Sequence, residues 1–298
     1  MRSPATRRLV LASVTAWLAG VLVVQPASPQ PSLQELLQRA GSYVRQLEDD
    51  FSAVISDEQY EQKVMLRNRR ALRRMASEMS FTWMPEAMMW LSVRDVLRVD
   101  GAAVADSRAR LDSAMTDRTP GRTSQLLRLR DEGARFNIGR IGRNFSDPML
   151  GLQVIDPNRQ QRFEFGVAGR DRVRGVDTVQ LTFAEQAHPT LIVRGTDGQD
   201  LPTHGDIWIG AADGVVRQTR LITDDSKSGT RATIAVTFGH DPKLDRWLPV
   251  RMDETYTQLS VMGGLSNPTR GVILERVDCV ALYANYRRFE TSGRLLTQ

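Results

Sequence analysis

The sequence predicts an α+β fold, a single curved antiparallel sheet (an open half β-barrel) with helices covering its concave face. Three observations lead to this prediction. From residue 159 onward, β-type segments follow one another with short turns between them, and short connections favour antiparallel neighbours. Two earlier segments, 32–48 and 124–136, have apolar residues at helical spacing. An antiparallel sheet with one polar face must bury the other, and these helices are the available covers.

The first 29 residues have the layout of a secretory signal peptide. Arg2, Arg7 and Arg8 precede an apolar run over 9–24, and a stretch with Pro and Ser follows. The run is shorter than the ~20 residues that cross a bilayer comfortably. We therefore expect residues 1–29 to be removed and residues 30–298 to form one domain, in the periplasm or outside the cell. An uncleaved N-terminal membrane anchor is the alternative.

The mature chain carries little net charge. The whole chain has a formal net charge of +5, and removal of the three leader arginines leaves +2. A charge this small gives no reason to expect a nucleic-acid partner. Cys279 is the only cysteine, so an intramolecular disulfide is excluded. Its apolar strand context, VDCVALY, favours a buried thiol over a redox or metal-binding role.

The first helix is predicted at 32–48. Ser32 and Glu35 have the spacing of a capping box, in which each side chain bonds the backbone N–H of the other residue. Apolar residues recur at helical spacing from Leu33 to Leu47, so one face of this helix is apolar and needs a surface to cover.

Two strands are predicted after this helix. Residues 78–83 alternate between apolar and polar side chains, and Pro85 interrupts the pattern. Residues 88–99 form the second strand, with a bulge expected near Asp95. Asp100-Gly101 has the composition of a tight turn and ends this strand.

A polar stretch at about 100–160 is predicted to be a helical insertion. Its three expected pieces are a short helix at 107–115, the helix at 124–136 with Thr123 or Ser124 as its cap, and a short helical piece at 149–155.

The second half of the chain is predicted to be a series of strands. The candidate strands are 161–167, 177–185, 206–209, 215–223, 230–238, 248–257 and 272–283. The stretch IWIGAADGVVRQTRLI is predicted to be a hairpin with Asp213-Gly214 in its turn, because Asp-Gly between alternating apolar residues is a strong hairpin signal.

The order of these segments is similar to that of a known group of exported proteins. After the leader comes the amphipathic segment SLQELLQRAGSYVRQLEDDFSAVISDEQY, and later HGDIWIGAADGVVRQTRL, with Trp208, the Asp-Gly turn and Arg217. The chain ends with LPV before a strand and a closing pattern of Tyr283, Tyr286, Arg287 and Phe289. In these features the chain resembles the lipoprotein-carrier family represented by the LolA and LolB proteins and the related RseB sensor domain.

This resemblance spans roughly residues 31–292. It implies a concave apolar cavity suited to acyl chains, or to a lipidated or unfolded partner. The stretch at about 100–160 departs from a minimal carrier, which suggests a distinct branch of the family. Because no functional motif matches, no ligand-binding residue is carried over from it.

The stretch MASEMSFTWMPEAMMW gathers five Met, two Trp and one Phe within residues 75–90. Unbranched thioether side chains repack around varied ligands, so this stretch is a candidate cavity lining. The candidate lining residues are Met79, Phe81, Trp83, Met89, Leu91 and Trp208. A packed core is the plain alternative. Binding of Cu(I) by the thioethers is a further alternative, which the intervening aromatic residues and the lack of a nearby His disfavour.

Five arginines lie within eight positions. They are Arg67, Arg69, Arg70, Arg73 and Arg74. One interpretation is a solvated connection between strands. The other is a docking surface for an anionic membrane or an acidic envelope protein, since each Arg adds ~1 kcal/mol near an anionic surface.

No catalytic or metal-binding motif is found. The chain has no HExxH, GxSxG, Walker loop or GxGxxG pattern, and His188, His204 and His240 are widely spaced. We therefore expect no enzymatic activity, no cofactor and no metal. A hydrolase would need one of these histidines within hydrogen-bond reach of a Ser or Asp in a cleft.

The function that these features favour is an exported, non-enzymatic carrier or receptor that binds a lipid or another hydrophobic ligand, or a lipidated partner, in an apolar cavity. The alternative is a periplasmic scaffold or sensor module that binds a protein and has a filled core. A lined cavity of several hundred Å³ would favour the carrier, because ligand pockets have this scale.

Overall fold

The computed structural model describes residues 31–51, 53–66, 69–105, 107, 109–117, 119, 121–143, 145–194, 198–262 and 271–289. The predicted leader, residues 1–29, lies outside these ranges and stays a prediction, as does its cleavage. The described residues belong to one compact unit, Pro31–Gln298. Within them, no helix is both long and apolar enough to cross a membrane.

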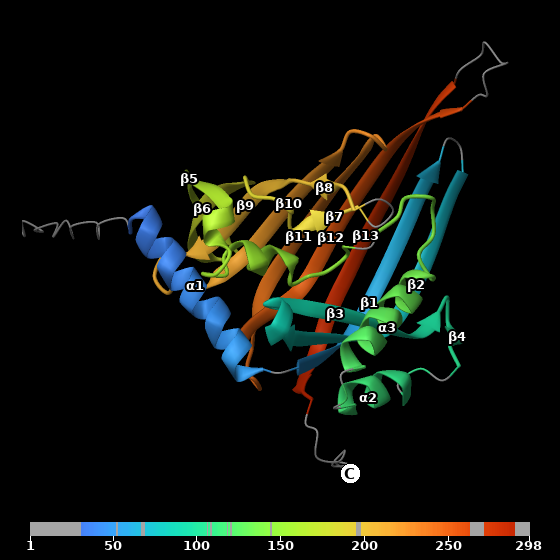
Figure 1. Cartoon of the computed structure of the whole chain (residues 1–298), viewed down its shortest axis with the longest axis horizontal. Helices are drawn as coiled ribbons and strands as arrows, with labels where there is room; N and C mark the ends of the chain where they lie inside the picture. Colours follow the sequence, from blue (N-terminus) through green and yellow to red (C-terminus); the bar gives the residue numbers. More distant parts are fainter. Residues whose placement is uncertain are drawn as a thin grey trace, which may run out of the picture. The chain divides into compact units, whose positions relative to one another are not determined.

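Eleven strands form one open sheet in which every neighbouring pair is antiparallel (Figure 1). They are β1 (Ala53–Leu66), β2 (Arg69–Met84), β3 (Met89–Val99), β4 (Ala102–Ala103), β5 (Phe163–Val173), β6 (Val176–Glu185), β9 (Thr203–Gly210), β10 (Val216–Asp225), β11 (Thr230–Asp241), β12 (Arg246–Met262) and β13 (Gly271–Arg288). Their order across the sheet is β4-β3-β2-β1-β13-β12-β11-β10-β9-β6-β5. The predicted fold class and the seven predicted strands of the second half are confirmed. A separate two-stranded ladder pairs β7 (Ile192–Val193) with β8 (Asp200–Leu201).

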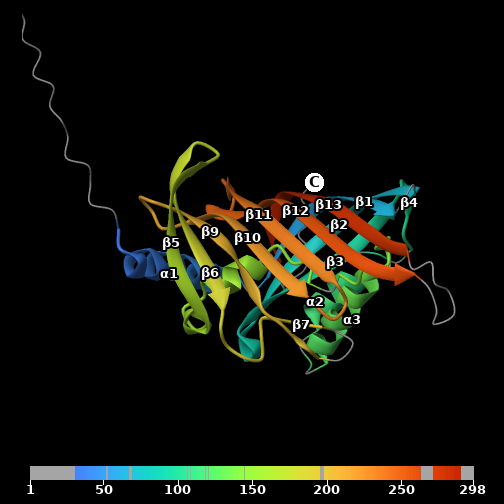
Figure 2. The same cartoon turned by 90° about the horizontal axis from the view of Figure 1, so that it is seen from above.

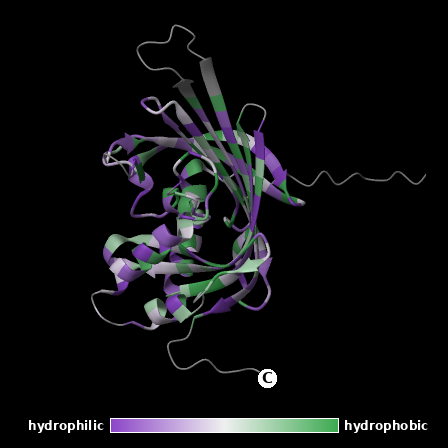
Figure 3. Ribbon diagram, turned by 90° about the vertical axis from the view of Figure 1, so that its right-hand side faces the viewer, coloured by the Kyte–Doolittle hydropathy of each residue, from purple (hydrophilic) through white to green (hydrophobic). Residues whose placement is uncertain are grey.

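The sheet is strongly curved, and both of its edges bend toward the same side (Figure 2). We call the face on that side the inner face; it carries Tyr60, Phe81 and Tyr256, which belong to one large buried cluster. Seen from the side, apolar segments gather inside the curve (Figure 3). Burial of this inner face is therefore the main source of apolar contact in the fold.

The helix α1 (Leu33–Asp50) covers one end of the inner face. The predicted capping box is confirmed: the N–H of Glu35 donates to Ser32 Oγ at 3.2 Å, and the N–H of Ser32 donates to Glu35 Oε2 at 2.8 Å. The apolar side of α1, including Leu36 and Leu47, is buried in the inner cluster. The hydroxyl of Tyr43 donates to the Trp247 carbonyl oxygen, which ties α1 to β12.

The two strands predicted after α1 are β2 and β3. A 3₁₀ turn, η1 (Pro85–Ala87), joins them where Pro85 was expected to interrupt the pattern. The bulge expected near Asp95 lies two residues further on, at Leu97, between the pairs Ser77–Val96 and Ala76–Arg98. At the predicted turn, Asp100 and Gly101 have φ of 50° and 89°, as a two-residue hairpin turn requires.

The stretch at 100–160 contains α2 (Ala109–Thr116), α3 (Arg122–Ala134) and the 3₁₀ turns η2 (Leu150–Val154) and η3 (Gln160–Arg162). The predicted cap at Thr123 or Ser124 is wrong, because α3 starts one residue after Gly121 and has no side-chain cap. Since side chains alternate along β3, Leu91 and Val93 lie on the outer face and pack against α2 and α3. The inner face is covered by α1 and by the segment 138–155.

The two edges of the sheet differ. The strand β4 has only two residues, so α3 lies against much of β3, and the carbonyl oxygen of Arg94 would be 2.5 Å from a Cβ added to Gly133. At the other edge, β5 has a bulge at Ala168 and charged residues beyond it, such as Arg170 and Asp171.

The close approach of α3 to β3 makes Gly133 a test of this packing. An alanine in a helix is usually favoured over glycine by ~1 kcal/mol. Here the added Cβ would meet the Arg94 backbone, so we expect Gly133→Ala to lower the free energy of unfolding by about 1–2 kcal/mol. Urea denaturation measures the change. Ser124→Ala, at an exposed position of α3, is the control and should have little effect. A Gly133→Ala variant more stable than wild type would contradict this packing.

Candidate functional site

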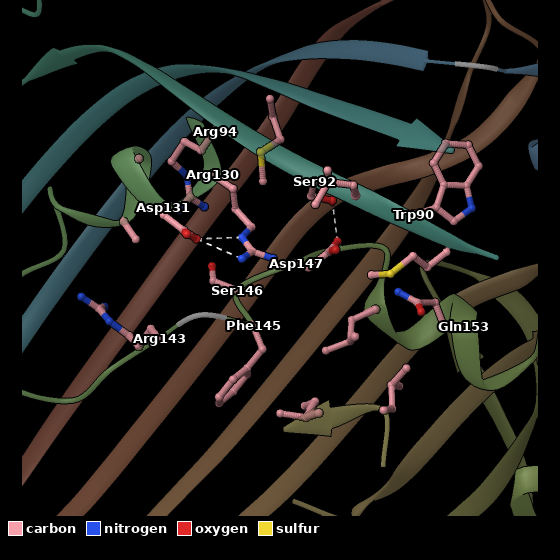
Figure 4. A pocket seen from close by; sticks show the side chains of 18 of the residues that line it. Trp90, Ser92, Arg94, Arg130, Asp131, Arg143, Phe145, Ser146, Asp147 and Gln153 are labelled. Carbon is pink, nitrogen blue, oxygen red and sulfur yellow. Dashed lines mark hydrogen bonds and ion pairs between the residues drawn. The ribbon is translucent and has the colours of Figure 1, made fainter. Parts of the chain in front are cut away.

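A pocket of about 290 Å³ lies along β3, where the inner-face residues Met79 and Trp90 and the outer-face residues Met89 and Leu91 all contribute to its lining (Figure 4). Its walls come from four parts of the chain: β2 and β3, the end of α3, the segment 143–153, and residues 191–193. The apolar part of the lining includes Met79, Met89, Leu150 and Ile192. The volume is at the lower end of the roughly 300–1,000 Å³ range of small-ligand sites.

A buried ion pair lies beside this pocket. Arg94 of β3 donates from Nε and Nη2 to the two carboxylate oxygens of Glu58 on β1, at 2.6 and 2.9 Å. Both side chains are buried, and the guanidinium lies 4.2 Å from the ring centroid of Tyr60. Two buried charges are tolerated here because each is paired and hydrogen-bonded.

A second polar group continues across the inner face to β12. Glu254 accepts hydrogen bonds from the hydroxyls of Tyr60, at 2.7 Å, and Tyr256, at 2.5 Å. Burial, reinforced by the nearby Glu254, raises the pKa of both tyrosines well above the ordinary value. Both hydroxyls therefore keep their protons and act as donors.

Arg143 holds the segment 138–147 over the inner face. Its Nη2 donates to Gln62 Oε1 at 2.7 Å and to the Ile138 carbonyl oxygen at 2.8 Å, and its Nη1 lies 3.0 Å from the Cys279 sulfur. Burial raises the pKa of Cys279 to about 12. The thiol is therefore buried, as predicted, and neutral.

Asp147 is the half-buried carboxyl group of the pocket lining. It accepts hydrogen bonds from Ser92 Oγ at 2.5 Å and from the backbone N–H of Met149 at 2.8 Å. Burial raises the pKa of Asp147 from its ordinary value of 3.8 to about 6, against the opposing effect of these two hydrogen bonds. The carboxyl group thus gains or loses its proton in the mildly acidic range.

Several polar atoms around the pocket have no hydrogen-bond partner among the described residues. They are Trp90 Nε1, Asn137 Oδ1, Arg143 Nε, Ser146 Oγ, and both Oε1 and Nε2 of Gln153. A buried polar group without a partner costs about 1–3 kcal/mol, so a cluster of them is unusual in a region that serves packing alone.

A second pocket, of about 450 Å³, lies on the other side of Phe145, which lines both. Ile141, Leu201 and Ala232 contribute its apolar part, and Thr223 is among its polar residues. The Phe145 ring packs against Tyr256, with ring centroids 6.0 Å apart. The segment that carries Arg143 therefore separates the two pockets.

The six residues predicted to line one cavity are divided. Met79, Met89 and Leu91 line the 290 Å³ pocket. Phe81 and Trp83 pack against the inner cluster instead, Phe81 beside Tyr283 and Tyr286 and Trp83 beside Trp90. Their role in ligand binding stays a prediction.

Trp208 lies apart from the other five, on the outer face. Its ring nitrogen donates to Asp171 Oδ2 at 2.8 Å, and its partner across β10 is Gln218. The expectation that Trp208 faces the cavity is corrected by this placement. The physical reason is strand alternation, which puts Ile207 and Ile209 of β9 in the inner cluster and Trp208 on the opposite side.

The polar side of the pocket was not predicted. Arg94, Asp147 and Gln153 each lie in an apolar context, WLSVRDVL, FSDPML and GLQVI. A charged or amide side chain at an inward position of such a segment must find a partner, and this is the signal that could have identified them.

Four residues of the arginine cluster, Arg69, Arg70, Arg73 and Arg74, lie on β2 and not in a connection between strands. Arg67 lies outside the described residues, and Arg69 and Arg70 are exposed. Arg73 pairs with Asp100 at 3.4 Å and donates to the Phe136 carbonyl oxygen at 3.1 Å, while Arg74 pairs with Glu61 at 2.9 Å. Docking on an anionic surface stays a prediction, and Arg69 and Arg70 are the residues most available for it.

The three histidines lie away from both pockets. His188 pairs with Asp200 at 2.6 Å and His240 with Asp245 at 2.9 Å, but both residues are exposed and line neither pocket. His204 is exposed on β9. Over the described part of the chain, no group of three or more His, Cys, Asp or Glu is arranged to hold a metal ion.

No protein-family model and no curated protein matches this sequence. Similar solved structures include a putative outer membrane lipoprotein-sorting protein domain from Vibrio parahaemolyticus, at 9% identity and a TM-score of 0.32, which covers 87% of this chain and 95% of that one. A DUF1329 family protein from Desulfovibrio piger has 10% identity and a TM-score of 0.31 over 86% and 94% of the two chains. MucB, in its complex with MucA, has 9% identity and a TM-score of 0.21 over 87% and 100%. A lipoprotein-sorting domain is thus among the solved structures to which this chain is similar.

The ion pair beside the pocket is tested by removing one partner. Arg94→Met leaves Glu58 buried without a counter-charge, so we expect the free energy of unfolding to fall by about 3–5 kcal/mol. The double variant Glu58→Gln/Arg94→Met, which carries no buried charge, should recover a large part of this loss. Urea denaturation at pH 7 measures both. Equal losses in the single and double variants would show that the pair does not act as an electrostatic unit.

The raised pKa of Asp147 predicts a pH-dependent stability. The folded state holds this proton more tightly than the unfolded chain, so the contribution of Asp147 to stability is largest below pH 4 and decreases as the pH rises through 6. Asp147→Asn keeps the shape and removes the titration. The stability of wild type relative to Asp147→Asn should therefore fall between pH 4 and pH 7, as measured by urea denaturation. A constant difference over this range would refute the assignment.

Proposed function

We propose that this protein is an exported, non-enzymatic carrier or receptor that binds the apolar chain of an amphiphile in the pocket along β3 of its curved sheet. The supporting observation is the pocket of about 290 Å³, which is already formed between the sheet, α3 and the segment 143–153. A preformed concave site with an apolar lining and a few polar groups is the usual form of a small-molecule site.

The lining favours a flexible apolar ligand. Met79 and Met89 contribute unbranched thioether side chains, which adapt to ligands of different shape more readily than branched residues do. The modest volume suits a single short acyl chain better than a lipid with several chains. The second pocket, beyond Phe145, offers space on the same face for a longer chain if that ring moves.

The chemistry of the pocket supports a binding role over catalysis. Its charged groups are engaged in hydrogen bonds: Arg94 with Glu58, and Arg130 with Asp131 at 3.0 Å. Arg143 bonds Gln62, and Asp147 accepts from Ser92. The Cys279 thiol is held neutral by burial, and a neutral thiol is a poor nucleophile. No histidine lines the pocket to act as a base for Ser92 or Ser146.

A second candidate function is a protein-interaction module without a small ligand. The observation that favours it is the extent to which the chain fills its own inner face, with α1, the segment 138–155 and the Glu58–Arg94 pair all buried there. Such a module would bind a protein partner through its surface and would leave amphiphiles unbound.

The pocket proposal predicts a specific effect of blocking its mouth. Ala134, at the exposed end of α3, lines the pocket, so Ala134→Trp should obstruct entry and weaken binding of a fluorescent fatty acid by about tenfold or more, without loss of thermal stability. Ser124→Trp, exposed on the same helix and outside the lining, is the matched control and should bind like wild type.

The measurement is titration of delipidated protein with fluorescent fatty acids and lysolipids, together with native mass spectrometry of the protein as purified. Saturable binding that Ala134→Trp alone weakens would support the carrier. If delipidated protein shows no saturable binding and no lipid is retained in the native mass spectra, the carrier function is excluded and the interaction module is favoured.

A further inference from the structure

Gln153 is the most unusual residue of the pocket. It is 3% exposed within the turn η2, whose other four residues, Leu150, Gly151, Leu152 and Val154, are buried as well. Neither its amide oxygen nor its amide nitrogen has a hydrogen-bond partner among the described residues, although a Leu or Met of similar size would avoid that loss. A buried amide in this position indicates that its hydrogen-bond partner comes from a bound ligand.

The position of Gln153 is fixed by its turn. A Cβ added to Gly151 would lie 2.5 Å from Thr219 Oγ1, so η2 is pressed closely against β10. Leu152 and Val154 are fully buried in the inner cluster, which leaves Gln153 on the side that lines the pocket. In Figure 4, Gln153 and Trp90 lie toward one end of the pocket, and Ser92 and Asp147 lie between them and the charged residues.

Trp90 adds a second unpartnered group at this end. Its side chain is 2% exposed, and its ring N–H has no acceptor among the described residues. With the Gln153 amide, this end of the pocket offers N–H donors from two side chains and one carbonyl acceptor, all uncharged.

The charges around the pocket are balanced in number. The guanidinium groups of Arg94 and Arg130 bond the carboxylates of Glu58 and Asp131, and Arg143 is held by Gln62. With Asp147, the acidic groups equal these three cations in number. Among the described residues, Arg143 and Asp147 bond only neutral groups, but the labelled arginines lie away from the Gln153 end of the pocket (Figure 4). An anionic head group bound at Gln153 and Trp90 would therefore have no cation beside it.

We propose that the ligand of this pocket carries an uncharged polar head with both a hydrogen-bond acceptor and a donor, which binds Gln153 and Trp90 while its chain lies along Met79, Met89 and Leu150. Primary amides of fatty acids and monoacylglycerols belong to this class. The proposal rests on the carrier function proposed above and specifies the chemistry of its ligand. A site that hydrogen-bonds a polar group rejects ligands that leave its own groups unpaired, so the head group should control affinity.

The test compares ligands that share a ten-carbon chain and differ in their head group. Displacement of a fluorescent decyl-chain probe at pH 8 is measured with decanamide, monodecanoylglycerol, decanoate and decyltrimethylammonium. We expect the two neutral ligands to bind about tenfold more tightly than the two ions, because neither ion offers both a donor and an acceptor to Gln153 and Trp90. Gln153→Leu should weaken decanamide about tenfold and leave decanoate unchanged, while Gln258→Leu, in the second pocket, should leave the whole series unchanged.

The outcomes separate this inference from the carrier function. If the probe binds and decanoate or decyltrimethylammonium competes as well as decanamide, the head-group inference is wrong and the carrier function stands. The same conclusion follows if Gln153→Leu leaves the decanamide-to-decanoate ratio at its wild-type value. Absence of probe binding to wild type overturns both. Gln153→Met, which keeps an unbranched chain of similar length, gives the same comparison if Gln153→Leu fails to fold.

Discussion

The buried pair of Glu58 and Arg94 is the interaction on which the inner face depends. The two residues lie on β1 and β3, with β2 between them, so the pair joins strands that are not neighbours. A shift of either strand by one residue would turn one charge to the outer face and leave the other buried alone. The pair thus stabilises one register of the β1–β2–β3 edge, where the pocket forms.

This pair is one part of a polar band across an otherwise apolar surface. From Arg94 and Glu58 the band passes through Tyr60 to Glu254 on β12, and a separate group joins Gln62, Arg143 and Cys279. Burial of such groups costs free energy. It also specifies a unique arrangement, because each donor can bond only an acceptor that lies at one position. The band also gives the pocket its mixed character. In the proposed function, the apolar chain of the ligand contacts methionine and leucine side chains there, and its polar head contacts groups whose positions the fold fixes.

The architecture was predictable from the sequence, and the site was predictable only in part. The strands from β5 to β13 alternate regularly and are separated by turn residues, and α1 has a complete capping box, so local patterns identify them. The strand β1 has no comparable alternation, because its inward positions hold Glu58 and Gln62 as well as Tyr60. Those polar residues can be buried because Arg94 bonds Glu58 and Arg143 bonds Gln62. Both are contacts between distant parts of the chain. The pocket depends on the same long-range contacts. Trp208 was assigned to the wrong face because nothing near it in the sequence shows which face of β9 is buried.

An open sheet has two exposed edges, and each could pair with the edge of another molecule and start a growing aggregate. The protein blocks each edge in a different way. On one side β4 is reduced to two residues and α3 lies against β3, so no strand of a second molecule can reach the Arg94 carbonyl where Gly133 meets it. On the other side, the Ala168 bulge and the charged residues of β5 interrupt the regular hydrogen-bond ladder that a strand of a second molecule would extend. Both features oppose pairing with a second sheet edge, so the sheet can stay open without closure into a full barrel.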